Sequence, residues 1–462
     1  MVKGPMSNSI KNLNLIPELT NNLESLGYQE LTPIQTKALP VVLAGKDIIA
    51  KAKTGSGKTA AFSLGILNRL KIEDKNIQAL ILCPTHELAA QVAEEIRKLS
   101  RLIKNSKTLV ICGGSSEYQQ LSSLAHGAHI IVGTPGRVLK FLKKGAMKID
   151  RISHFVLDEA DRMLDMGFRD DIESIKSFVP KNTQTLLFSA TFPEEIREPS
   201  KDFQRNPVEV TVDSTHNENV IKEHFIKLDS HQDKLKALIN IFKTFNPQTT
   251  VIFCKTKQLC ADVARALNKA GVEALAMHGD LDQNERTVVL TKFANKSCLV
   301  LVATDVAARG LDVKDLEGVV NFDMATDAEV YTHRIGRTGR AGKEGLSFTL
   351  YVESELHKID EIENYQNKKI KSLNASDLNA NGIIKLNAQM RTIYINGGKK
   401  DKLRKGDILG AIIGEIGLDL SQVGMIQVFE KQSFVAIDKS VVGLVTSKLE
   451  KIKARKYKVG LA

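Results

Sequence analysis

One short segment, residues 52–59, constrains the fold of this chain more than any other. It reads Ala-Lys-Thr-Gly-Ser-Gly-Lys-Thr, follows an apolar run at residues 47–52 and precedes a helical pattern at residues 60–70. Glycines in such a turn let consecutive backbone N–H groups point at phosphate oxygens, and the start of the helix adds partial positive charge. The segment therefore predicts a phosphate-binding loop between a buried strand and a helix, as in doubly wound α/β domains.

This loop and a second, acidic turn are suited to bind a nucleotide and its metal ion. The loop supplies Thr54, Gly55, Ser56, Gly57, Lys58 and Thr59 as nucleotide-binding residues. We expect Lys58 to reach the β- and γ-phosphates of ATP and Thr59 to bind Mg²⁺. A carboxylate that ends a buried strand is costly unless it serves a cation or a hydrogen bond. Asp158 is therefore predicted to hold the Mg²⁺ and Glu159 to polarise an attacking water; a loop without a ligand and a solvated acidic turn are the alternatives.

Apolar runs followed by helical patterns recur along the chain, as they do in buried parallel sheets. The first series lies at residues 47–52, 79–83, 108–112, 129–132, 154–157 and 184–188. The second series lies at residues 250–254, 272–277, 298–303, 318–321 and 346–352. A polar stretch at residues 210–220 separates them and is predicted to be a hinge. The pattern predicts two doubly wound α/β domains with a cleft between them, and ligands at the C-terminal ends of their strands.

A third unit is predicted at residues 390–462, where both the element order and the charge change. We expect strand, helix, strand, strand, helix and strand at residues 391–396, 406–416, 425–430, 433–438, 440–451 and 456–461. This βαββαβ order is the ferredoxin-like arrangement of RRM domains. Residues 391–462 contain fourteen Lys and Arg against seven Asp and Glu, which is +7 of the total net charge of +11. So concentrated a positive charge favours a polyanionic partner.

The length and composition fit a chain of several domains without a membrane segment. The expected division of the 462 residues is an N-terminal domain at 1–212, a second domain at 213–366, a linker at 367–389 and a C-terminal domain at 390–462. No run of about 20 apolar residues is present and the N-terminus lacks an apolar signal core, so a cytoplasmic location is expected. The five cysteines form no Cys-x-x-Cys pair, which favours reduced thiols and no structural zinc.

Six short motifs follow one another in order along residues 113–340. They are Gly-Gly at 113–114, Thr-Pro-Gly-Arg at 134–137, Asp-Glu-Ala-Asp at 158–161, Ser-Ala-Thr at 189–191, Ala-Thr-Asp-Val-Ala-Ala-Arg-Gly-Leu-Asp at 303–312 and His-Arg-Ile-Gly-Arg-Thr-Gly-Arg at 333–340. In these motifs the chain resembles the DEAD-box RNA helicases, over residues 10–361. The resemblance implies two tandem RecA-like domains that bind ATP and Mg²⁺ and hydrolyse ATP in response to RNA.

The resemblance implies nucleotide contacts outside the phosphate loop. Gln35 matches a glutamine that reads the adenine edge, a task suited to an amide that donates and accepts at once. Arg337 and Arg340 match catalytic arginine fingers that reach the γ-phosphate from the second domain. Asp312 matches an acid that contacts the nucleotide, and His333 matches a residue that links the fingers to the acidic motif.

The resemblance also implies an RNA-binding rim that contacts phosphates and sugars. The matching positions are Pro84, Thr85, Gly114, Thr134, Arg137, Gly279, Arg286 and Thr304. Ser189 and Thr191 match the motif that couples the nucleotide site to strand separation. Backbone and 2′-hydroxyl contacts would select RNA without a sequence preference; the alternative is that each of these residues caps or packs its own loop.

The chain departs from the family pattern at three positions. His86 stands where arginine is common, so a permanent charge is replaced by a shorter and mostly neutral side chain. Ala325 stands where proline is common, and Ile10 stands near the position of an aromatic residue that stacks on the base. Weaker stacking on the base is therefore expected.

The segment at residues 393–412 carries a second resemblance, which runs to the end of the chain. It is similar to the RNA-binding domain of the bacterial DbpA helicases, whose relatives recognise a hairpin of 23S ribosomal RNA. The predicted RNA contacts are Tyr394, Lys399, Lys400, Lys402, Arg404 and Lys405. A second basic run at residues 451–458 is expected to close the other end of the sheet. Tyr394 and Phe434 are the aromatic residues of the two central strands, and a module for protein or nonspecific RNA contact is the alternative.

These features favour an enzyme, an RNA-dependent ATPase that separates short duplexes in ribosomal precursor RNA during large-subunit assembly. Messenger or cold-shock RNA is the alternative substrate. The alternative of another class is an ATP-gated RNA clamp with little turnover. Lys58, Glu159, Arg337 and Arg340 argue against the clamp, because a clamp does not need an acid that positions water. A monomer without a membrane partner is expected.

Overall fold

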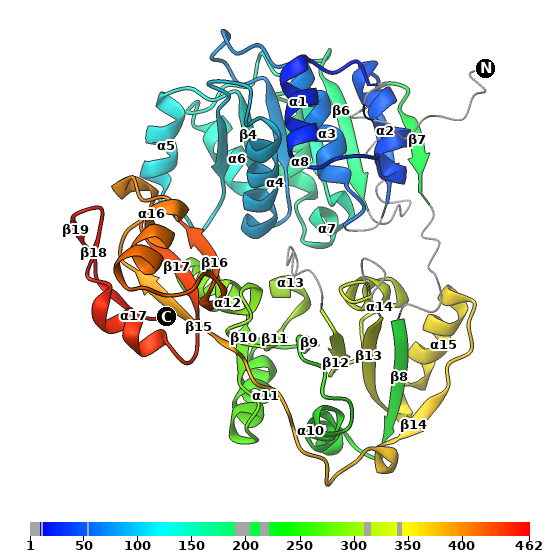
Figure 1. Ribbon diagram of the computed structural model, residues 1–462. Coiled ribbons are helices and arrows are strands. Elements are labelled where there is room, and N and C mark those ends of the chain that lie inside the picture. The colour runs from blue at the N-terminus through cyan, green and yellow to red at the C-terminus, as the bar shows by residue number, and fades with distance from the viewer. Residues whose placement is uncertain are drawn as a thin grey trace. The chain divides into compact units, whose positions relative to one another are not determined.

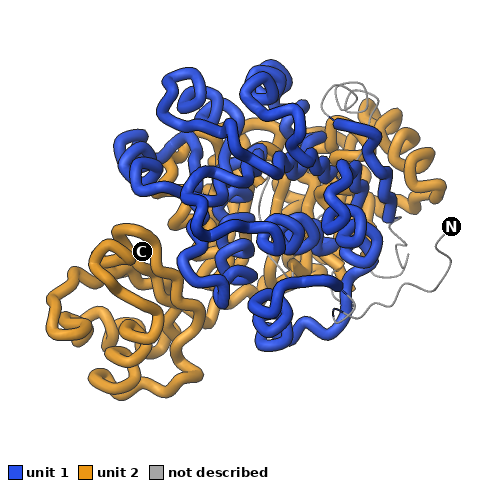
Figure 2. The backbone as a smooth tube through the Cα atoms, turned by 90° about the horizontal axis from the view of Figure 1, so that it is seen from above, with its two compact units in different colours: residues 1–215 blue, residues 216–462 orange. Residues whose placement is uncertain are grey.

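The computed structural model describes residues 10, 13–52, 55–189, 204–212, 221–308, 316–339 and 344–462 of the chain. Figure 2 shows the two compact units into which the backbone divides, at residues 1–215 and 216–462. Each unit has its own hydrophobic clusters. None of the helices in these described ranges is long and apolar enough to pass through a bilayer.

Within its described residues, the first unit is built on a seven-stranded parallel sheet in the order β3-β4-β2-β5-β6-β1-β7 (Figure 1). The strands are β1 (Ile48–Lys51), β2 (Ala79–Leu82), β3 (Thr108–Ile111), β4 (Ile130–Gly133), β5 (His154–Asp158), β6 (Gln184–Ser189) and β7 (Val208–Thr211). The helices are α1 (Pro17–Ser25), α2 (Pro33–Leu43), α3 (Lys58–Asn68), α4 (His86–Leu99), α5 (Glu117–Ala125), α6 (Pro135–Lys143), α7 (Ala160–Asp165) and α8 (Arg169–Lys176).

Both faces of this sheet are covered by helices. Successive side chains of a strand point to opposite faces, so Val156 packs with α1 to α4 while its neighbours Phe155 and Leu157 pack with α5 to α8. The six apolar runs predicted in the first half form β1 to β6, which confirms that prediction. The edge strand β7 begins just before the stretch predicted to be a hinge, and residues 213–220 of that stretch lie outside the described residues.

The second unit repeats this architecture up to Asn374. Its described residues form a seven-stranded parallel sheet in the order β10-β11-β9-β12-β13-β8-β14. The strands are β8 (Ile221–Leu228), β9 (Thr250–Phe253), β10 (Ala274–Met277), β11 (Val300–Ala303), β12 (Gly318–Asn321), β13 (Gly345–Val352) and β14 (Ser372–Asn374). The helices are α10 (Lys234–Phe245), α11 (Lys257–Lys269), α12 (Gln283–Ala294), α13 (Asp305–Ala308), α14 (Ala328–Ile335) and α15 (Leu356–Gln366). The five predicted runs form β9 to β13, so the prediction of two tandem doubly wound domains is confirmed.

The end of the chain folds into a small antiparallel sheet with helices on one face. The strand order is β16-β17-β15-β20, and the strands are β15 (Met390–Ile395), β16 (Val423–Val428), β17 (Ser433–Asp438) and β20 (Val459–Leu461). The helices are α16 (Lys405–Gly410), which continues as a π-helical turn at Ala411–Glu415, and α17 (Val442–Lys448). Ile393, Val435 and Ile437 of the strands pack with Ile408 and Val445 of the helices. The predicted RRM-like order is confirmed.

Two predictions for this domain are wrong. The helix expected at residues 440–451 ends at Lys448, and the basic run at residues 451–458 does not close the sheet. That run instead forms a separate hairpin of β18 (Lys451–Ile452) and β19 (Arg455–Lys456). The turn between its strands is made by Lys453 and Ala454, which adopt left-handed φ angles of 52° and 61°. Two successive positive φ angles match the twist of a tight hairpin. The helix ends before it, because Leu449 leaves the helical conformation with ψ of 79°.

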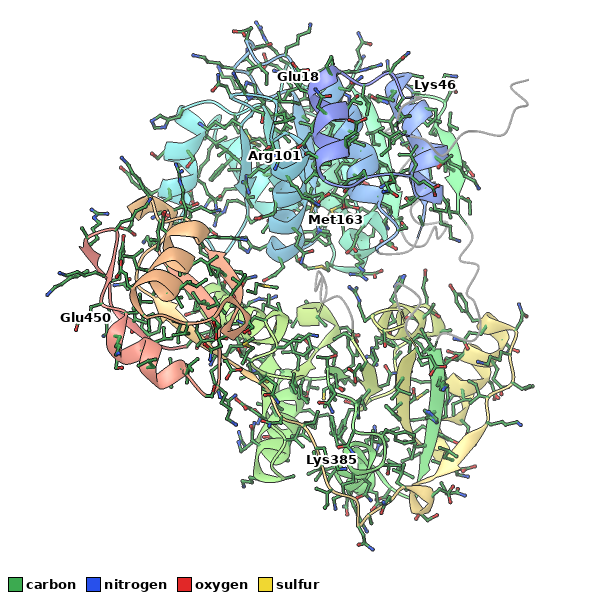
Figure 3. The ribbon with its side chains drawn as sticks, viewed as in Figure 1. Glu18, Lys46, Arg101, Met163, Lys385 and Glu450 are labelled. Atoms are coloured by element: carbon green, nitrogen blue, oxygen red, sulfur yellow. The ribbon has the colours of Figure 1, made fainter. Side chains whose placement is uncertain are left out.

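The segment predicted as a linker is attached along its length to the second unit. β14 lies inside that segment and pairs with β8. Lys385, labelled in Figure 3, donates its backbone N–H to Asn246 Oδ1 at the end of α10, at 2.7 Å. At the start of β15, the buried Thr392 hydroxyl accepts a hydrogen bond from Asn295 Nδ2 at 2.9 Å. The linker and the first C-terminal strand are therefore held by specific polar contacts.

Candidate active site

The described end of the loop between β1 and α3 contains two glycines in left-handed conformations, Gly55 and Gly57. Gly57 is the N-cap of α3 and has φ of 95°, a left-handed conformation that glycine adopts without strain. A β-carbon at Gly57 would lie 2.5 Å from Gln35 Nε2, so a larger residue would also collide with α2. Lys58 is buried, and its ammonium donates to Ala52 O at 2.7 Å. Lys58 thus bonds the residue that follows β1, at a helix N-terminus suited to anions.

Gln35 of α2 is bonded to this loop. Its Oε1 accepts a hydrogen bond from Thr32 N at 2.9 Å, and its Nε2 donates to Gly57 O at 3.2 Å. Thr32 adds a hydrogen bond from its hydroxyl to Ser56 O at 2.7 Å. The amide predicted to read adenine therefore accepts from Thr32 N at the start of α2 and contacts the predicted phosphate loop directly through Gly57 O.

The predicted metal and water ligands lie at the end of β5. Asp158 is 3% exposed, and burial raises its pKa to about 7, while the nearby Lys58 ammonium lowers it and Glu159 raises it further. Glu159 has φ of 54°, which is uncommon for a residue with a side chain. Its Oε2 accepts a hydrogen bond from Arg162 Nη1 at 2.9 Å, and both side chains are buried. Two adjacent buried acids thus meet one lysine and one arginine.

Ser189, predicted to couple the nucleotide site to strand separation, connects two parts of the site. Its hydroxyl accepts a hydrogen bond from Asp161 N at 3.4 Å, and its backbone carbonyl accepts one from Ala52 N at 3.0 Å. It therefore lies between the acidic turn and the start of the phosphate loop. Thr54 and Thr191, which belong to the same predicted site, lie outside the described residues.

The strand order places the predicted RNA residues of the first unit beside the nucleotide residues. Carboxyl ends of parallel strands meet at one edge of a sheet. The neighbours β3, β4 and β2 are followed by the predicted RNA residues, and β5, β6 and β1 by the predicted nucleotide residues. The RNA residues in this group are Pro84, Thr85, Gly114, Thr134 and Arg137. Two sets of residues are therefore brought to adjacent halves of the same edge.

Some of these rim side chains already serve their own loops. Thr85 caps α4 by accepting a hydrogen bond from Leu88 N at 3.2 Å. Arg137 donates to Ser115 O at 3.2 Å and to Gln120 Oε1 at 3.3 Å. The described backbone at Gly114 is left-handed, with φ of 75°. These contacts order the loops that follow β2, β3 and β4 and leave their roles toward RNA as predictions.

In the second unit, as in the first, the predicted RNA residues and the predicted nucleotide residues follow different strands of the sheet. Gly279 and Thr304 follow the neighbouring strands β10 and β11, and Arg286 lies in α12 between them. His333 lies in α14 and Arg337 follows that helix, beyond β12. Arg337 is buried. The other two predicted nucleotide contacts of this unit, Asp312 and Arg340, lie outside the described residues.

Comparison with known proteins decides the family. The family model for the DEAD/DEAH box helicase matches residues 32–198, the helicase conserved C-terminal domain matches residues 233–342, and the DbpA RNA binding domain matches residues 392–461. The chain belongs to the DEAD-box ATP-dependent RNA helicases. It is therefore an RNA-dependent ATPase with an additional RNA-binding domain, as the motifs predict.

Two bacterial relatives match this chain over nearly their whole length. The chain is 47% identical to the ATP-dependent RNA helicase DbpA of Escherichia coli (strain K12), over 97% of this chain and 98% of that one. It is 36% identical to DbpA of Bacillus subtilis (strain 168), over 92% and 93%. Among solved structures, S. cerevisiae Dbp5 bound to RNA and ADP BeF3 matches 80% of this chain and 97% of that one, with 33% identity and a TM-score of 0.73. Mss116p bound to ssRNA and AMP-PNP matches 81% and 80%, with 28% identity and a TM-score of 0.73.

The C-terminal domain of this DEAD-box helicase presents an exposed basic surface. Its members are exposed lysine and arginine side chains that precede or begin α16: Lys399, Lys400, Lys402, Arg404 and Lys405. The β18–β19 hairpin lies beside them, because Lys453 pairs with Asp407 at 2.7 Å and Arg455 with Asp401 at 3.7 Å. The two basic segments predicted to be separate are thus joined by ion pairs.

The two aromatic residues of this domain's central strands lie on the face away from its helices. Tyr394 and Phe434 are direct partners in the pairing of β15 with β17, while their neighbours Ile393 and Val435 face the core. Phe434 is 2% exposed and packs edge-on against Phe429. Tyr394 is half-buried, with its ring over Gly460. Tyr394 therefore has more surface available for a base than Phe434.

Sequence reasoning missed one charged residue of the DEAD-box site. Arg162 lies three residues after Glu159 and pairs with it. Residues three apart on a helix are neighbours, so the spacing in Asp-Glu-Ala-Asp-Arg could have revealed the pair once α7 was placed. The Thr32–Gln35 cap had a sequence signal too, since Thr followed three residues later by Gln is typical of a helix start.

Proposed function

We propose that the helicase binds ATP at the carboxyl ends of β1, β5 and β6 and hydrolyses it with Glu159 as the base. The ammonium of Lys58, now bonded to Ala52 O, would exchange that carbonyl for phosphate oxygens. Gln35 would read adenine while it contacts the loop that holds the phosphates. Arg337 and Arg340 are proposed to stabilise the charge on the transferring phosphoryl group.

Asp158 at the end of β5 and Thr59 in the first turn of α3 are suited to a magnesium ion. Asp158 and Thr59 offer the oxygen ligands that Mg²⁺ prefers, and a carboxylate whose pKa is raised by burial gains from a divalent cation. Among the described residues no group of three or more His, Cys, Asp or Glu could hold a metal. The remaining ligands would therefore be phosphates and water, as is usual for Mg²⁺. When bound, the ion would neutralise charge on the transferring phosphoryl group.

We further propose that the RNA substrate is 23S ribosomal RNA and that the helicase acts during assembly of the large ribosomal subunit. The observation that carries this proposal is the DbpA-type RNA-binding domain at residues 392–461, with five exposed basic residues in one segment. Such a segment can meet several RNA phosphates. The β18–β19 hairpin extends the basic surface, so the domain can hold a folded RNA while the helicase domains act on a nearby duplex.

The test is the ATPase rate against a panel of RNAs. The panel contains bulk messenger RNA, a generic duplex, ribosomal RNA and the peptidyl-transferase-region hairpin with flanking sequence. Lys399→Gln/Lys400→Gln/Lys402→Gln removes three charges from the basic surface. Lys236→Gln/Lys269→Gln/Lys448→Gln removes three exposed charges elsewhere in the same unit and is the matched control.

We expect the ribosomal fragment to stimulate ATP hydrolysis most. The variant at residues 399–402 should lose that preference, and the control triple variant should keep it. Equal stimulation by every RNA would refute the ribosomal target and favour a general messenger or cold-shock substrate. Tight RNA retention with negligible turnover on every RNA would favour an ATP-gated clamp.

A further inference from the structure

Arg162 is a buried charge inside the active site of the first unit. Its side chain and that of Glu159 are 6% and 5% exposed, and the Nη1–Oε2 distance is 2.9 Å. A buried ion must be paired to be tolerated. Arg162 therefore has its partner in the one carboxylate that is proposed to activate the attacking water.

The backbone fixes the direction of this contact. Glu159 is left-handed, with φ of 54° and ψ of 53°, and α7 begins at the next residue. The N–H groups of Arg162 and Met163 donate to Glu159 O at 3.1 and 3.2 Å, which closes the first turn. Met163, labelled in Figure 3, is fully buried in the core of the first unit. The Arg162 guanidinium thus extends from α7, which Met163 anchors in the core, and contacts Glu159 at Oε2.

We propose that Arg162 is a positioning residue for ATP hydrolysis, which holds Glu159 by Oε2 so that Oε1 faces the attacking water. In the reaction the water proton moves to Oε1 while the water oxygen bonds to the γ-phosphorus. The bond from phosphorus to the bridging oxygen breaks, and ADP leaves with that electron pair. Without Arg162 the carboxylate can rotate, and misplacement by about 1 Å can cost roughly a hundredfold in rate. This inference rests on the proposed role of Glu159.

The experiment measures steady-state ATP hydrolysis at saturating activating RNA for Arg162→Gln, Arg162→Lys, Glu159→Gln and the Arg162→Gln/Glu159→Gln double variant. Arg169→Gln is the matched control, because Arg169 pairs with Glu173 at 3.1 Å on the surface of α8. ATP-dependent RNA binding and the thermal unfolding midpoint are measured for each protein. Arg162→Lys keeps a charge at the site and guards against loss of folding in the glutamine variant.

We expect Arg162→Gln to lower kcat by about tenfold to a hundredfold, with KM for ATP and ATP-dependent RNA binding changed less than about threefold. Arg162→Lys should recover part of kcat, because an ammonium keeps the positive charge but lacks the rigid, planar donor set of a guanidinium. The double variant should be no slower than Glu159→Gln, since residues that act as a unit are not additive. Arg169→Gln should match the wild type.

A kcat for Arg162→Gln within about twofold of the wild type would overturn the proposal. So would equal losses in kcat, KM and RNA binding, which indicate a structural role. Full turnover by Glu159→Gln would overturn the base assignment and the positioning role together. None of these outcomes depends on which RNA activates best, so this experiment tests the role of Arg162 independently of the proposed ribosomal RNA target.

Discussion

The two parallel sheets have the same topology but differ at the point where phosphate would bind. When the strands of each are numbered along the chain, both sheets run 3-4-2-5-6-1-7. The first helix of each sheet after its first strand begins with a lysine, Lys58 in α3 and Lys234 in α10. The Lys58 ammonium contacts a backbone carbonyl of its own glycine-rich loop. The Lys234 ammonium instead pairs with Asp323, which follows β12, at 2.9 Å.

Asp323 occupies the topological place of the acidic turn that follows β5. Its second oxygen accepts a hydrogen bond from Lys255 N at 2.8 Å, so both of its oxygens are bonded. The connection from β8 to α10 contains a short 3₁₀ turn at His231–Asp233 and no glycine. In the second sheet the lysine and the acid therefore bond each other, whereas in the first sheet the Lys58 ammonium bonds Ala52 O. The fold is duplicated, and we propose that the phosphate site is not.

The largest effect, on the rate of ATP hydrolysis, is expected for Glu159, the proposed base of the first sheet. Glu159→Gln should lower kcat for ATP hydrolysis by about a thousandfold, because a general base contributes roughly 10²–10⁴. ATP and RNA binding should persist, since the amide keeps the shape of the side chain. Steady-state ATPase assays with RNA-binding measurements check this, and retained hydrolysis would refute the assignment of that carboxylate.

The next effect concerns Arg334, a buried arginine of α14 in the second unit whose side chain is bonded to several neighbouring groups. Arg334 donates to both oxygens of Asp305 at 2.7 Å and also to Asn321 Oδ1 and Asp323 O. Asp305→Asn should destabilise the second unit by about 2–4 kcal/mol, because it leaves a buried guanidinium without its counter-charge.

Denaturant-induced unfolding, followed at the transition of the second unit, measures this loss of unfolding free energy. Asp262→Asn breaks an exposed pair with Arg265 and should cost less than about 1 kcal/mol. Equal losses from the two substitutions would show that the Arg334 network is not a structural core of this sheet.

A smaller effect follows from the burial of Asp158 in the acidic turn of the first sheet. Burial raises the pKa of Asp158 to about 7, so the folded state binds its proton more tightly than the unfolded state. Stability of the nucleotide-free protein should therefore fall as the pH rises from about 4 to about 7, and Asp158→Asn should remove this part of the dependence. Thermal unfolding of both proteins between pH 5 and 8 tests the sign; a pH dependence unchanged by the substitution would contradict it.

The smallest effect is expected at the rim of the same edge. His86 begins α4 after β2, and His86→Arg adds a permanent charge beside the predicted RNA residues. RNA should bind about twofold to fivefold more tightly at low salt, with the gain lost at high salt. A titration of RNA binding at two salt concentrations measures it, and a salt-independent gain would point to a base or packing contact instead.

The sequence was informative where strands are buried on both faces and where motifs carry chemistry. Runs such as residues 79–82 and 251–253 are apolar throughout, so β2 and most of β9 were predictable. The edge strands β7 and β14 alternate polar with apolar residues, and β8, next to β14, mixes them without a regular period, which weakens the pattern. The β18–β19 hairpin was hidden because its turn uses Lys453 and Ala454, residues without a turn preference.

The candidate site also has parts that the sequence predicts and contacts that it does not. The phosphate loop and the acidic turn were predictable because each is one continuous segment. The contacts of Gln35 with Gly57 and of Lys234 with Asp323 join segments far apart in the chain. Such contacts depend on strand order, which periodicity does not specify. The Arg162–Glu159 pair required the start of α7, a boundary set by the left-handed Glu159.

The most direct test of the difference between the two sheets compares Lys58→Gln with Lys234→Gln. Nucleotide affinity and unfolding are measured for both proteins. Lys58→Gln should weaken ATP binding at least about tenfold while the unfolding transitions stay in place, because its ammonium is proposed to serve phosphate. Lys234→Gln should keep the ATP affinity and destabilise the second unit, because it leaves the partly buried Asp323 without its ion pair. Loss of ATP binding in Lys234→Gln, or its retention in Lys58→Gln, would contradict the assignment of phosphate binding to the first sheet alone.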